Sequence, residues 1–455
     1  MSDDLERDLG LYSTLMISMG AMIGSGIFVL PALGFTKAGP AVVVAYVLAG
    51  VVVLPAALSK AEMATAMPES GGTYIYIDRA MGPLAGTVAG IGAWFSLVFK
   101  SSFALVGLGA YLLLFVAIPG GAITFVALGL AALIVLLNIA GTKQSGKFQA
   151  VVVTVVLVAL VAYVVNAGLV VDTTRYQPFA PTGSSGIVTA AAFVFVSYAG
   201  VTKVASVAEE VADPGRNLPL GMLGSMAIMT VIYAAVVGVV VGLNGPEILG
   251  ESGPGGGASL TPMADGAGDL FAGFGVVGIS IVAVVALTSM ANAGVLASSR
   301  FPLAMSRDSL LPRRLMRIDP RFKTPRNSIL LTGAVLVTLI AFVPVVELAK
   351  LASAFQILVF SFVNVALVAF RESGVESYQP EFTAPGYPYV QAVGVVGGLG
   401  LLTQMGTVPI LGAVAIIAGG VAWYLLYGRS RTDRRGALAV LLADRRGDPV
   451  PEKAD

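Results

Sequence analysis

The sequence predicts an all-α polytopic membrane protein with twelve transmembrane helices, and three observations support this fold class. Hydrophobic residues make up 56% of the 455 residues, and the mean hydropathy is +0.88. Only 12% of the residues are charged, about half the share that is typical of a soluble domain. Because a soluble domain of this size cannot bury so much apolar surface, a cytosolic enzyme, a disordered protein and a nucleic-acid-binding protein are excluded. The apolar residues also occur in runs of about 20, the length of a helix that crosses ~30 Å of hydrocarbon.

Twelve apolar runs, separated by charged or Pro/Gly-rich breaks, predict the individual spans. The runs are too long and too continuously apolar for the short alternating strands of a transmembrane barrel. They lie near 11–33, 39–59, 84–116, 121–141, 148–168, 186–208, 218–243, 269–299, 327–345, 347–370, 387–407 and 409–428. The charged tail 429–455 follows, which we expect to be mostly disordered, with one or two amphipathic turns in its segment GALAVLLADRR.

Basic residues are divided unequally between the two sets of loops. With the N-terminus inside, the inner loops and the tail hold 22 of the 27 lysines and arginines. The outer loops hold Lys37, Arg175 and Lys350, while Lys100 and Lys203 fall within spans. This bias predicts a multi-pass protein of the plasma membrane with both termini in the cytoplasm. The acidic beginning MSDDLERDLG lacks the basic region of a signal peptide.

Two residue types that carry much enzyme and metal chemistry are absent from the sequence. There is no cysteine and no histidine, so disulfides, thiolate chemistry and His-based metal sites are excluded. The spans also contain no paired carboxylates, and we therefore expect neither an enzyme nor a bound cofactor. The net charge of +1 gives no global attraction to nucleic acid.

The first span, MISMGAMIGSGIFVLPAL, contains several small residues at mid-membrane depth. Close helix packing is one interpretation, which Gly20 and Gly24 fit. The triplet Gly24-Ser25-Gly26 favours a second interpretation, because it lets the helix unwind and frees backbone N–H groups that then bind an anion or a dipole. The sixth span is interrupted similarly around Ser197 to Gly200. Paired interruptions in corresponding spans indicate an inverted repeat with a binding site at the midplane.

Five segments resemble the amino acid–polyamine–organocation family of transporters, in particular its amino acid permease and cationic amino acid transporter branch. In order they are MGAMIGSGIFVLP, AEMATAMPESGGTYIYIDRAMGPLAGTVAGIGAW, SYAGVTKVASVAEEVADPGRNLP, ASSRFPLAMSRDSLLPRRL with TPRNS, and FTAPGYPY. The resemblance extends over about residues 5–390 and implies a five-plus-five inverted repeat with discontinuous helices 1 and 6. It places repeat one at about 11–168, repeat two at about 186–370 and two extra C-terminal helices at about 387–428.

The resemblance also implies a substrate site and alternating access around it. The α-carboxylate of an amino acid would be held by backbone N–H groups of the Gly24-Ser25-Gly26 break, and the α-amino group by carbonyls at Ile23 and at Phe195 to Tyr198. Side chains of helices 3, 6, 8 and 10 would select the substrate. The expected site comprises Ile23, Gly24, Ser25, Gly26, Ile27, Ser96, Lys100, Phe195, Ser197, Tyr198 and Gly200. A pocket that contains Lys100 and no carboxylate favours neutral or acidic amino acids.

Two lysines lie inside the lipid and are candidates for ion coupling. A lysine at mid-bilayer costs ~2.5–3.5 kcal/mol even on the lenient insertion scale, so Lys100 either forms a structural ion pair or acts in transport, by titrating or by contacting a substrate anion. Lys203 lies two helical turns before Glu210 and therefore on the same face of an α-helix. An internal salt bridge, snorkelling towards the cytoplasm and a coupling role all fit Lys203.

The coupling ion itself is left open between H⁺ and Na⁺. Many proton-coupled relatives carry a lysine midway along helix 5, but this fifth span has no charge after Lys147. Helix 8 offers the adjacent hydroxyls of Thr288 and Ser289, which suit sodium as hard ligands or bond back to their own helix. The expected sodium site consists of Gly20, Ile23, Val285, Thr288 and Ser289.

The function predicted from the sequence is secondary transport of amino acids across the membrane, driven by an ion gradient. A carrier of potassium, polyamines or other organic amines with the same fold is the near alternative, although no acidic cluster lines the spans. A transporter-like channel or sensor is a third class, but no repeated filter segment is present. The expected partners are a small-molecule amino acid and the lipid bilayer, with no nucleic acid; the sequence predicts neither the particular amino acid nor the oligomeric state.

Overall fold

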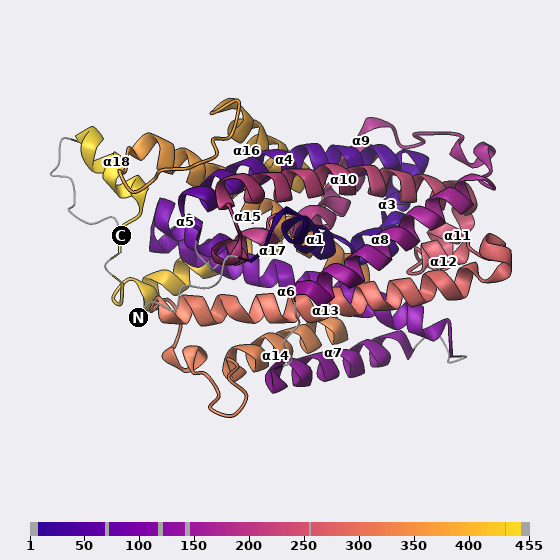
Figure 1. The fold of residues 1–455 in the computed structure, drawn as a ribbon, viewed down its shortest axis with the longest axis horizontal. Helices are drawn as coiled ribbons and strands as arrows, with labels where there is room; N and C mark the ends of the chain where they lie inside the picture. The colour runs from indigo at the N-terminus through magenta and orange to yellow at the C-terminus, as the bar shows by residue number, and fades with distance from the viewer. Residues whose placement is uncertain are drawn as a thin grey trace.

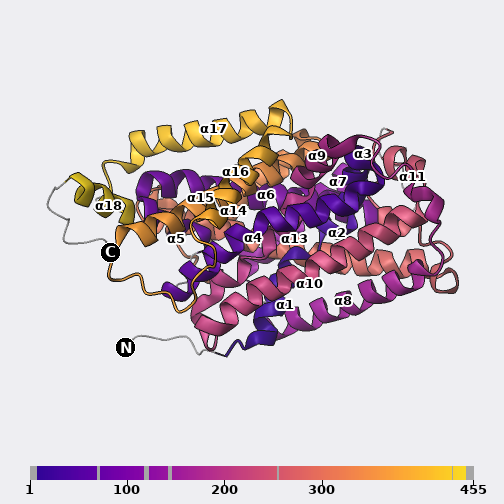
Figure 2. The ribbon, with the colours of Figure 1, turned by 90° about the horizontal axis from the view of Figure 1, so that it is seen from above.

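The computed structural model describes residues 8–68, 72–116, 122–141, 146–253, 256–432 and 434–446. These residues form an all-helical bundle whose long helices run side by side along the longest axis of the molecule (Figures 1 and 2). The only β-type pairing among them is two isolated bridges, Leu9 with Val211 and Gly253 with Gly257. The predicted helical class is therefore confirmed.

The helices coincide with the predicted apolar runs. Nine helical segments of the described residues are long and apolar enough to cross a membrane, and α1, α14 and α16 are shorter apolar helices. The main elements are α1 (Leu11–Met22), α2 (Ser25–Phe28), α3 (Leu30–Ala38), α4 (Val42–Ala66), α5 (Thr73–Met81), α6 (Pro83–Leu113), α7 (Ile123–Ala140), α8 (Gly146–Gly168), α9 (Gly183–Val194), α10 (Pro214–Leu243), α11 (Pro246–Glu251), α12 (Pro262–Asp265), α13 (Gly275–Arg307), α14 (Arg326–Phe342), α15 (Val345–Ser373), α16 (Tyr389–Thr403), α17 (Thr407–Trp423) and α18 (Ala437–Arg446).

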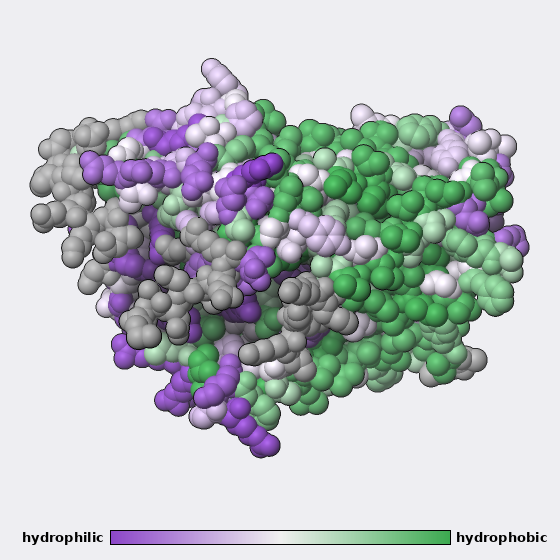
Figure 3. Space-filling view, viewed as in Figure 1, coloured by the Kyte–Doolittle hydropathy of each residue, from purple (hydrophilic) through white to green (hydrophobic). Residues whose placement is uncertain are grey.

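The outer surface of the bundle is apolar over most of its length. Large hydrophobic side chains are exposed on helices of every part of the chain, among them Leu136 at 63%, Val155 at 61% and Val396 at 70%. Figure 3 shows this apolar surface, with the hydrophilic residues gathered mainly at the end where α5 and α18 lie. An apolar exterior of this extent matches a lipid solvent.

The interior is formed by helices that are buried on several sides. Helix α6 packs against α13 and α15, and α10 packs against α4 and α1. Residues 22–35, which begin at the end of α1 and continue through α2 into α3, are all buried. Glycines and prolines mark several starts: α6 begins at Pro83 after Gly82, whose φ of 89° suits glycine. This packing places the interrupted part of the first span inside the protein.

Part of the C-terminal tail is helical rather than disordered. Helix α18 packs against α15 and α5, and its first residue, Ala437, is buried. The amphipathic turns expected in the segment GALAVLLADRR are therefore present as a helix, whose apolar face covers the surface of α15 and α5. Residues 433 and 447–455 of the tail lie outside the described residues.

Candidate functional site

The first span is interrupted at the predicted triplet. Helix α1 ends at Met22, and Ile23 has extended dihedrals of −69° and 124°. Gly24 has φ 158° and ψ −135°, a conformation that residues with a side chain rarely adopt, and α2 begins at Ser25. The first span is thus three helices, α1, α2 and α3, and its unwinding at Gly24 agrees with the interpretation of the glycines as a helix break.

The sixth span is interrupted over a longer stretch than the sequence predicts. Helix α9 ends at Val194, and two 3₁₀ segments follow, η4 (Phe195–Gly200) and η5 (Lys203–Glu210). The hydroxyl of Ser353 on α15 donates to the carbonyl of Phe193 at 2.8 Å and accepts from the N–H of Val196 at 3.1 Å. One side chain therefore satisfies both a donor and an acceptor that the end of the α-helix leaves free.

The two interruptions touch backbone to backbone. A Cβ atom placed on Gly200 would lie 2.3 Å from the carbonyl carbon of Ala21, and one on Gly26 would lie 3.0 Å from the Cα of Ser197. Real Cβ atoms essentially never come closer than 3.0 Å to such neighbours, and the Cβ on Gly26 would also lie 2.8 Å from the Cβ of Ser197. Glycine is therefore required at both positions for the first and the sixth span to meet this closely.

Tyrosine hydroxyls bond the carbonyls that the interruptions free. Tyr233 on α10 donates to the carbonyls of Met22 at 2.7 Å and Ser197 at 3.1 Å, which links the two interrupted helices. Tyr46 on α4 donates to the carbonyl of Gly26 at 2.6 Å, and Tyr111 on α6 to that of Phe28 at 2.9 Å. These rings are fully buried. The hydroxyls replace the intrahelical donors that a continuous helix would supply.

Two polar groups at the interruptions lack a strong hydrogen-bond partner within the described residues. The N–H of Ser25 contacts the thioether sulfur of Met290 on α13 at 3.2 Å, and the Ser25 hydroxyl lies 3.7 Å from the same sulfur. A thioether is a weak acceptor. The hydroxyl of Ser197 is buried and has no hydrogen-bond partner within the described residues. An anionic oxygen would bond either group more strongly than its present surroundings do.

The other predicted members of the break are buried, but they are already engaged. The N–H of Ile27 donates to the carbonyl of Gly24 at 3.0 Å. The ring of Phe195 packs edge-on against Phe360 of α15, with centroids 5.9 Å apart. The hydroxyl of Tyr198 donates to the carbonyl of Tyr46 at 3.0 Å.

Helix α6 brings Lys100 and Ser96 towards other interior helices. The ammonium of Lys100, whose side chain is buried, donates to the carbonyl of Ala21 at 3.1 Å, one residue before α1 ends. No ion pair to Lys100 is present within the described part of the chain. Ser96 bonds α15 instead, donating to the carbonyl of Ala352 at 3.0 Å. The structure thus connects Lys100, but not the Ser96 hydroxyl, with the interruption in helix 1.

Lys203 does not form a salt bridge with Glu210, which is one of the three interpretations of this lysine. The described residues contain no ion pair between them, because η5 is a 3₁₀ segment with a kink at Val207, where φ is −125° and ψ is 25°. Three residues per turn and the kink move Glu210 off the face on which an α-helix would place it. Lys203 is half-buried.

The predicted sodium site is only partly assembled. A cavity of about 10 Å³ is lined by Gly20, Ile23 and Ser289, as expected, but Gln149 of α8 also lines it. The hydroxyl of Ser289 donates to the side-chain oxygen of Gln149 at 3.0 Å. Val285 and Thr288 are exposed on α13 and do not line this cavity. The cavity has room for about one water-sized ligand.

The buried carboxylate of Glu62 binds the backbone of the FTAPGYPY segment. Glu62 near the end of α4 is fully buried and accepts from Arg371 Nε at 2.7 Å, from the Tyr378 hydroxyl at 3.0 Å and from the N–H of Ala384 at 2.7 Å. Arg371 donates to Glu62 through Nη2 as well. This ion pair fastens α4, α15 and the loop before α16 to one another.

A second charged cluster ties the tail to the bundle. Arg434 lies 3.3 Å from a carboxylate oxygen of Asp78 on α5 and 3.0 Å from one of Asp308, and Tyr74 donates to Asp308 at 2.8 Å. Burial raises the pKa of Asp78 to about 6, although Arg434 opposes this shift. The tail, α5 and the end of α13 thus have polar contacts that local sequence patterns do not reveal.

The fold and the site together define a class of protein. Two interrupted helices that meet inside an apolar helical bundle are the arrangement of many secondary transporters. The chain belongs to the amino acid permease family, whose model matches residues 9–429. The resemblance to this transporter family is therefore confirmed over nearly the whole chain.

Individual relatives carry names within the same class. The chain is 30% identical to a branched-chain amino acid permease of Bacillus subtilis over 453 residues, covering 94% of each chain. It is 29% identical to a methylthioribose transporter of Bacillus subtilis, covering 95% of each. It is 30% identical to the chloroplastic cationic amino acid transporter 9 of Arabidopsis thaliana, over 70% of this chain and 58% of that one. These proteins are permeases and transporters, not enzymes, and they support amino acid transport by this chain.

Proposed function

We propose that the protein is a secondary active transporter of amino acids that works by alternating access around the two interrupted helices. The observation that carries the proposal is the meeting of the breaks at Gly26 and Gly200, beside the weakly bonded Ser25 N–H and the unpartnered Ser197 hydroxyl. The substrate carboxylate binds at Gly24, Ser25 and Gly26 and displaces the Met290 thioether. Backbone N–H groups at the start of a helical segment favour an anion.

The substrate ammonium binds carbonyls of the same two breaks. Ile23 and the stretch from Phe195 to Tyr198 present extended or 3₁₀ backbone, in which carbonyls are not all used by the helix. The side chains around the breaks include Met290, Phe195 and Phe360, which are apolar. These surroundings favour a neutral aliphatic substrate, and relatives named as branched-chain amino acid permeases make leucine the first amino acid to test.

The membrane arrangement that we propose has twelve spans in two inverted repeats of five, at about 11–168 and 186–370, followed by two further helices at about 387–428. The basic loops and both termini lie in the cytoplasm of a plasma membrane. The gathering of hydrophilic side chains at the end with α5 and α18 (Figure 3) supports this orientation, because the excess of lysine and arginine marks the cytoplasmic side.

Lys100 is the first candidate for ion coupling. Its ammonium bonds the Ala21 carbonyl at the end of α1, so gain or loss of its proton changes a contact of the very helix that rearranges in transport. Lys100→Met should flatten the dependence of leucine uptake on pH between 5 and 8, while Lys203→Met tests the second lysine. Uptake by Lys100→Met that matches the wild type across this range would exclude proton coupling through Lys100.

Sodium coupling through the small cavity at Ser289 is the alternative. Carbonyls at Gly20 and Ile23 and the oxygens of Ser289 and Gln149 are hard ligands of the kind that sodium accepts. Replacing sodium by choline should then slow uptake, and Ser289→Ala should abolish that dependence. Uptake that is unaffected by choline removes this alternative.

Binding measurements on the purified protein test the substrate class. Thermal unfolding is recorded with each amino acid, methylthioribose, spermidine and potassium, with and without sodium. A ligand at 100 times its Kd stabilises the folded state by about 2.7 kcal/mol, so a neutral amino acid should raise the midpoint clearly. Stabilisation by potassium or spermidine and by no amino acid would overturn the proposal.

A further inference from the structure

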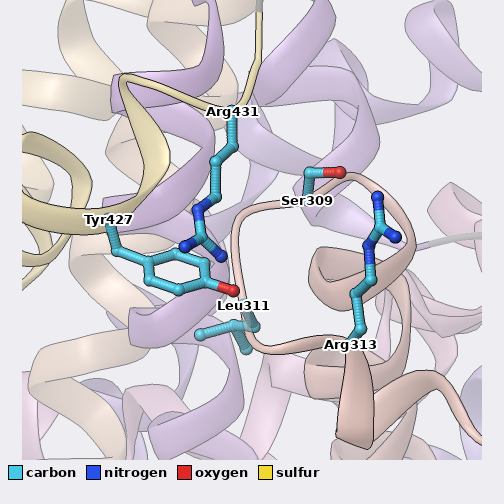
Figure 4. A pocket seen from close by; sticks show the side chains of 5 residues that line it. All are labelled: Ser309, Leu311, Arg313, Tyr427 and Arg431. Atoms are coloured by element: carbon cyan, nitrogen blue, oxygen red, sulfur yellow. The ribbon is translucent and has the colours of Figure 1, made fainter.

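A second cavity, far along the chain from the interrupted helices, lies where the loop after α13 meets the end of α17. Its volume is about 280 Å³, and it is lined by Ser309, Leu311, Arg313, Tyr427 and Arg431. Figure 4 shows Arg431 and Tyr427 on one side of the loop and Arg313 at its other end. We propose that this cavity binds the phosphodiester headgroup of an anionic phospholipid.

The positive charges of the two arginines that line the cavity favour binding of an anion. Neither Arg313 nor Arg431 has a carboxylate partner within the described residues. The nearby carboxylate of Asp308 is already bonded to Arg434 at 3.0 Å and to Tyr74. Both guanidinium groups line the cavity, and a guanidinium matches phosphate oxygens with paired N–H donors.

The walls of the cavity are held in place without the ligand. The guanidinium of Arg431 lies 3.9 Å from the centre of the Tyr427 ring, and Tyr427 stacks on Trp423 at 5.3 Å. The indole N–H of Trp423 donates to the carbonyl of Leu310 at 2.9 Å. The loop itself folds back on α13, because the N–H of Leu310 donates to the carbonyl of Met305 at 2.9 Å. A cavity that is organised in advance binds its ligand at a lower entropic cost.

The location favours a lipid as the source of the phosphate. Directly before Arg431 the chain exposes apolar side chains, with Leu425 at 53% and Leu426 at 87%. Apolar residues this exposed belong among acyl chains, and a tryptophan and tyrosines beside them are typical of the headgroup level. Helix α17 lies at the outer edge of the bundle (Figure 2), so the cavity is reached from the bilayer. Leu311 adds an apolar wall suited to the glycerol end of a lipid.

The chain supplies its own reporter for this site. It has two tryptophans, so a Trp94→Phe background leaves Trp423, which stacks on the lining residue Tyr427, as the single fluorophore. The protein is placed in nanodiscs of phosphatidylcholine with increasing brominated phosphatidylglycerol, and bromine quenching of Trp423 is recorded. Brominated phosphatidylcholine in the same amount measures ordinary lipid contact.

We expect phosphatidylglycerol to quench Trp423 more than phosphatidylcholine does, with saturation at a low mole fraction. Arg313→Gln with Arg431→Gln should weaken the apparent affinity by at least about 10-fold, since the charge-assisted hydrogen bonds from guanidinium to phosphate are lost. The matched control, Arg314→Gln with Arg317→Gln, removes the same charge from exposed positions of the same loop and should leave the excess quenching in place.

Three results would overturn the proposal. Equal quenching by the two lipids shows that the cavity does not select an anionic headgroup. Equal loss in the control pair shows a general charge effect instead of a site. Binding of inorganic phosphate to the protein in neutral nanodiscs that depends on Arg313 and Arg431, without excess quenching by phosphatidylglycerol, assigns the cavity to a soluble anion.

Discussion

Gly200→Ala should separate the two interrupted helices and impair transport. The ideal Cβ at this position lies 2.3 Å from the carbonyl carbon of Ala21 and 2.4 Å from its oxygen. Ordinary van der Waals contact begins at 3.4 Å, so the backbones must move apart by about 1 Å. The obstacle is backbone, which cannot rotate away as a side chain can.

The size of the effect follows from this displacement. Forcing an extra methyl group into a packed interior costs about 1–3 kcal/mol of folding free energy. The proposed carboxylate and ammonium sites lie on opposite sides of this contact, and a misplacement of 1 Å can cost about 100-fold where groups must act together. We therefore expect leucine uptake to fall by at least about 10-fold.

The assay is uptake of labelled leucine into proteoliposomes, with thermal unfolding of the same preparation recorded in parallel. Gly278→Ala on α13 is the matched control, because its Cβ would meet nothing within 4 Å. The control should transport like the wild type. If Gly200→Ala matches the wild type in both uptake and unfolding midpoint, the helices do not meet as described.

Three further substitutions probe the contacts around the site. Tyr233→Phe leaves the carbonyls of Met22 and Ser197 without their donor and should lower the free energy of unfolding by about 1–3 kcal/mol; an unchanged unfolding midpoint would argue against the bridge. Arg371→Leu strands the buried carboxylate of Glu62 and should cost about 3–5 kcal/mol, of which Glu62→Gln in the same protein should restore a part; a double variant no more stable than the single one contradicts this. The pKa of Asp78 is raised to about 6 from an ordinary 3.8, so the folded state binds the proton more tightly than the unfolded state does. The stability that comes from protonated Asp78 is therefore complete below pH 3.8 and is lost as pH rises through 6. Compared with Asp78→Asn, the wild type should therefore lose about 3 kcal/mol of stability over that interval in pH-dependent unfolding, and parallel pH profiles would contradict the shift.

Much of the fold could be predicted from the sequence, because a chain inside the bilayer must satisfy its backbone hydrogen bonds internally. Apolar runs of a fixed length must become helices in lipid, and the predicted runs are helical, with the first and the sixth divided into shorter helical segments. The helix break at the triplet Gly24-Ser25-Gly26 could also be predicted, because glycine in a helix interior lowers the stability of the helix. The full extent of the interruption in the sixth span is harder to predict, since residues such as Phe195 and Val196 carry no local signal of 3₁₀ structure.

Contacts between distant helices could not be predicted in this way. Tyr233, Met290 and Gln149 stand in apolar helices and look like ordinary members of those helices, yet they bond the interruption or line the cavity. Thr288, a member of the expected sodium site, does not line the cavity for a geometric reason. Adjacent residues of an α-helix point about 100° apart, so Ser289 faces the interior while Thr288 faces outward.

The decisive experiment is competition for counterflow of labelled leucine in proteoliposomes by leucine, by leucine methyl ester and by 3-methylbutylamine, which lacks the carboxylate. If the N–H groups at Gly24, Ser25 and Gly26 hold the carboxylate, both analogues should compete about 10- to 100-fold more weakly than leucine, because a hydrogen bond to a charged group contributes about 1.5–3 kcal/mol. Equal competition by 3-methylbutylamine would show that the interrupted first helix does not bind a substrate carboxylate.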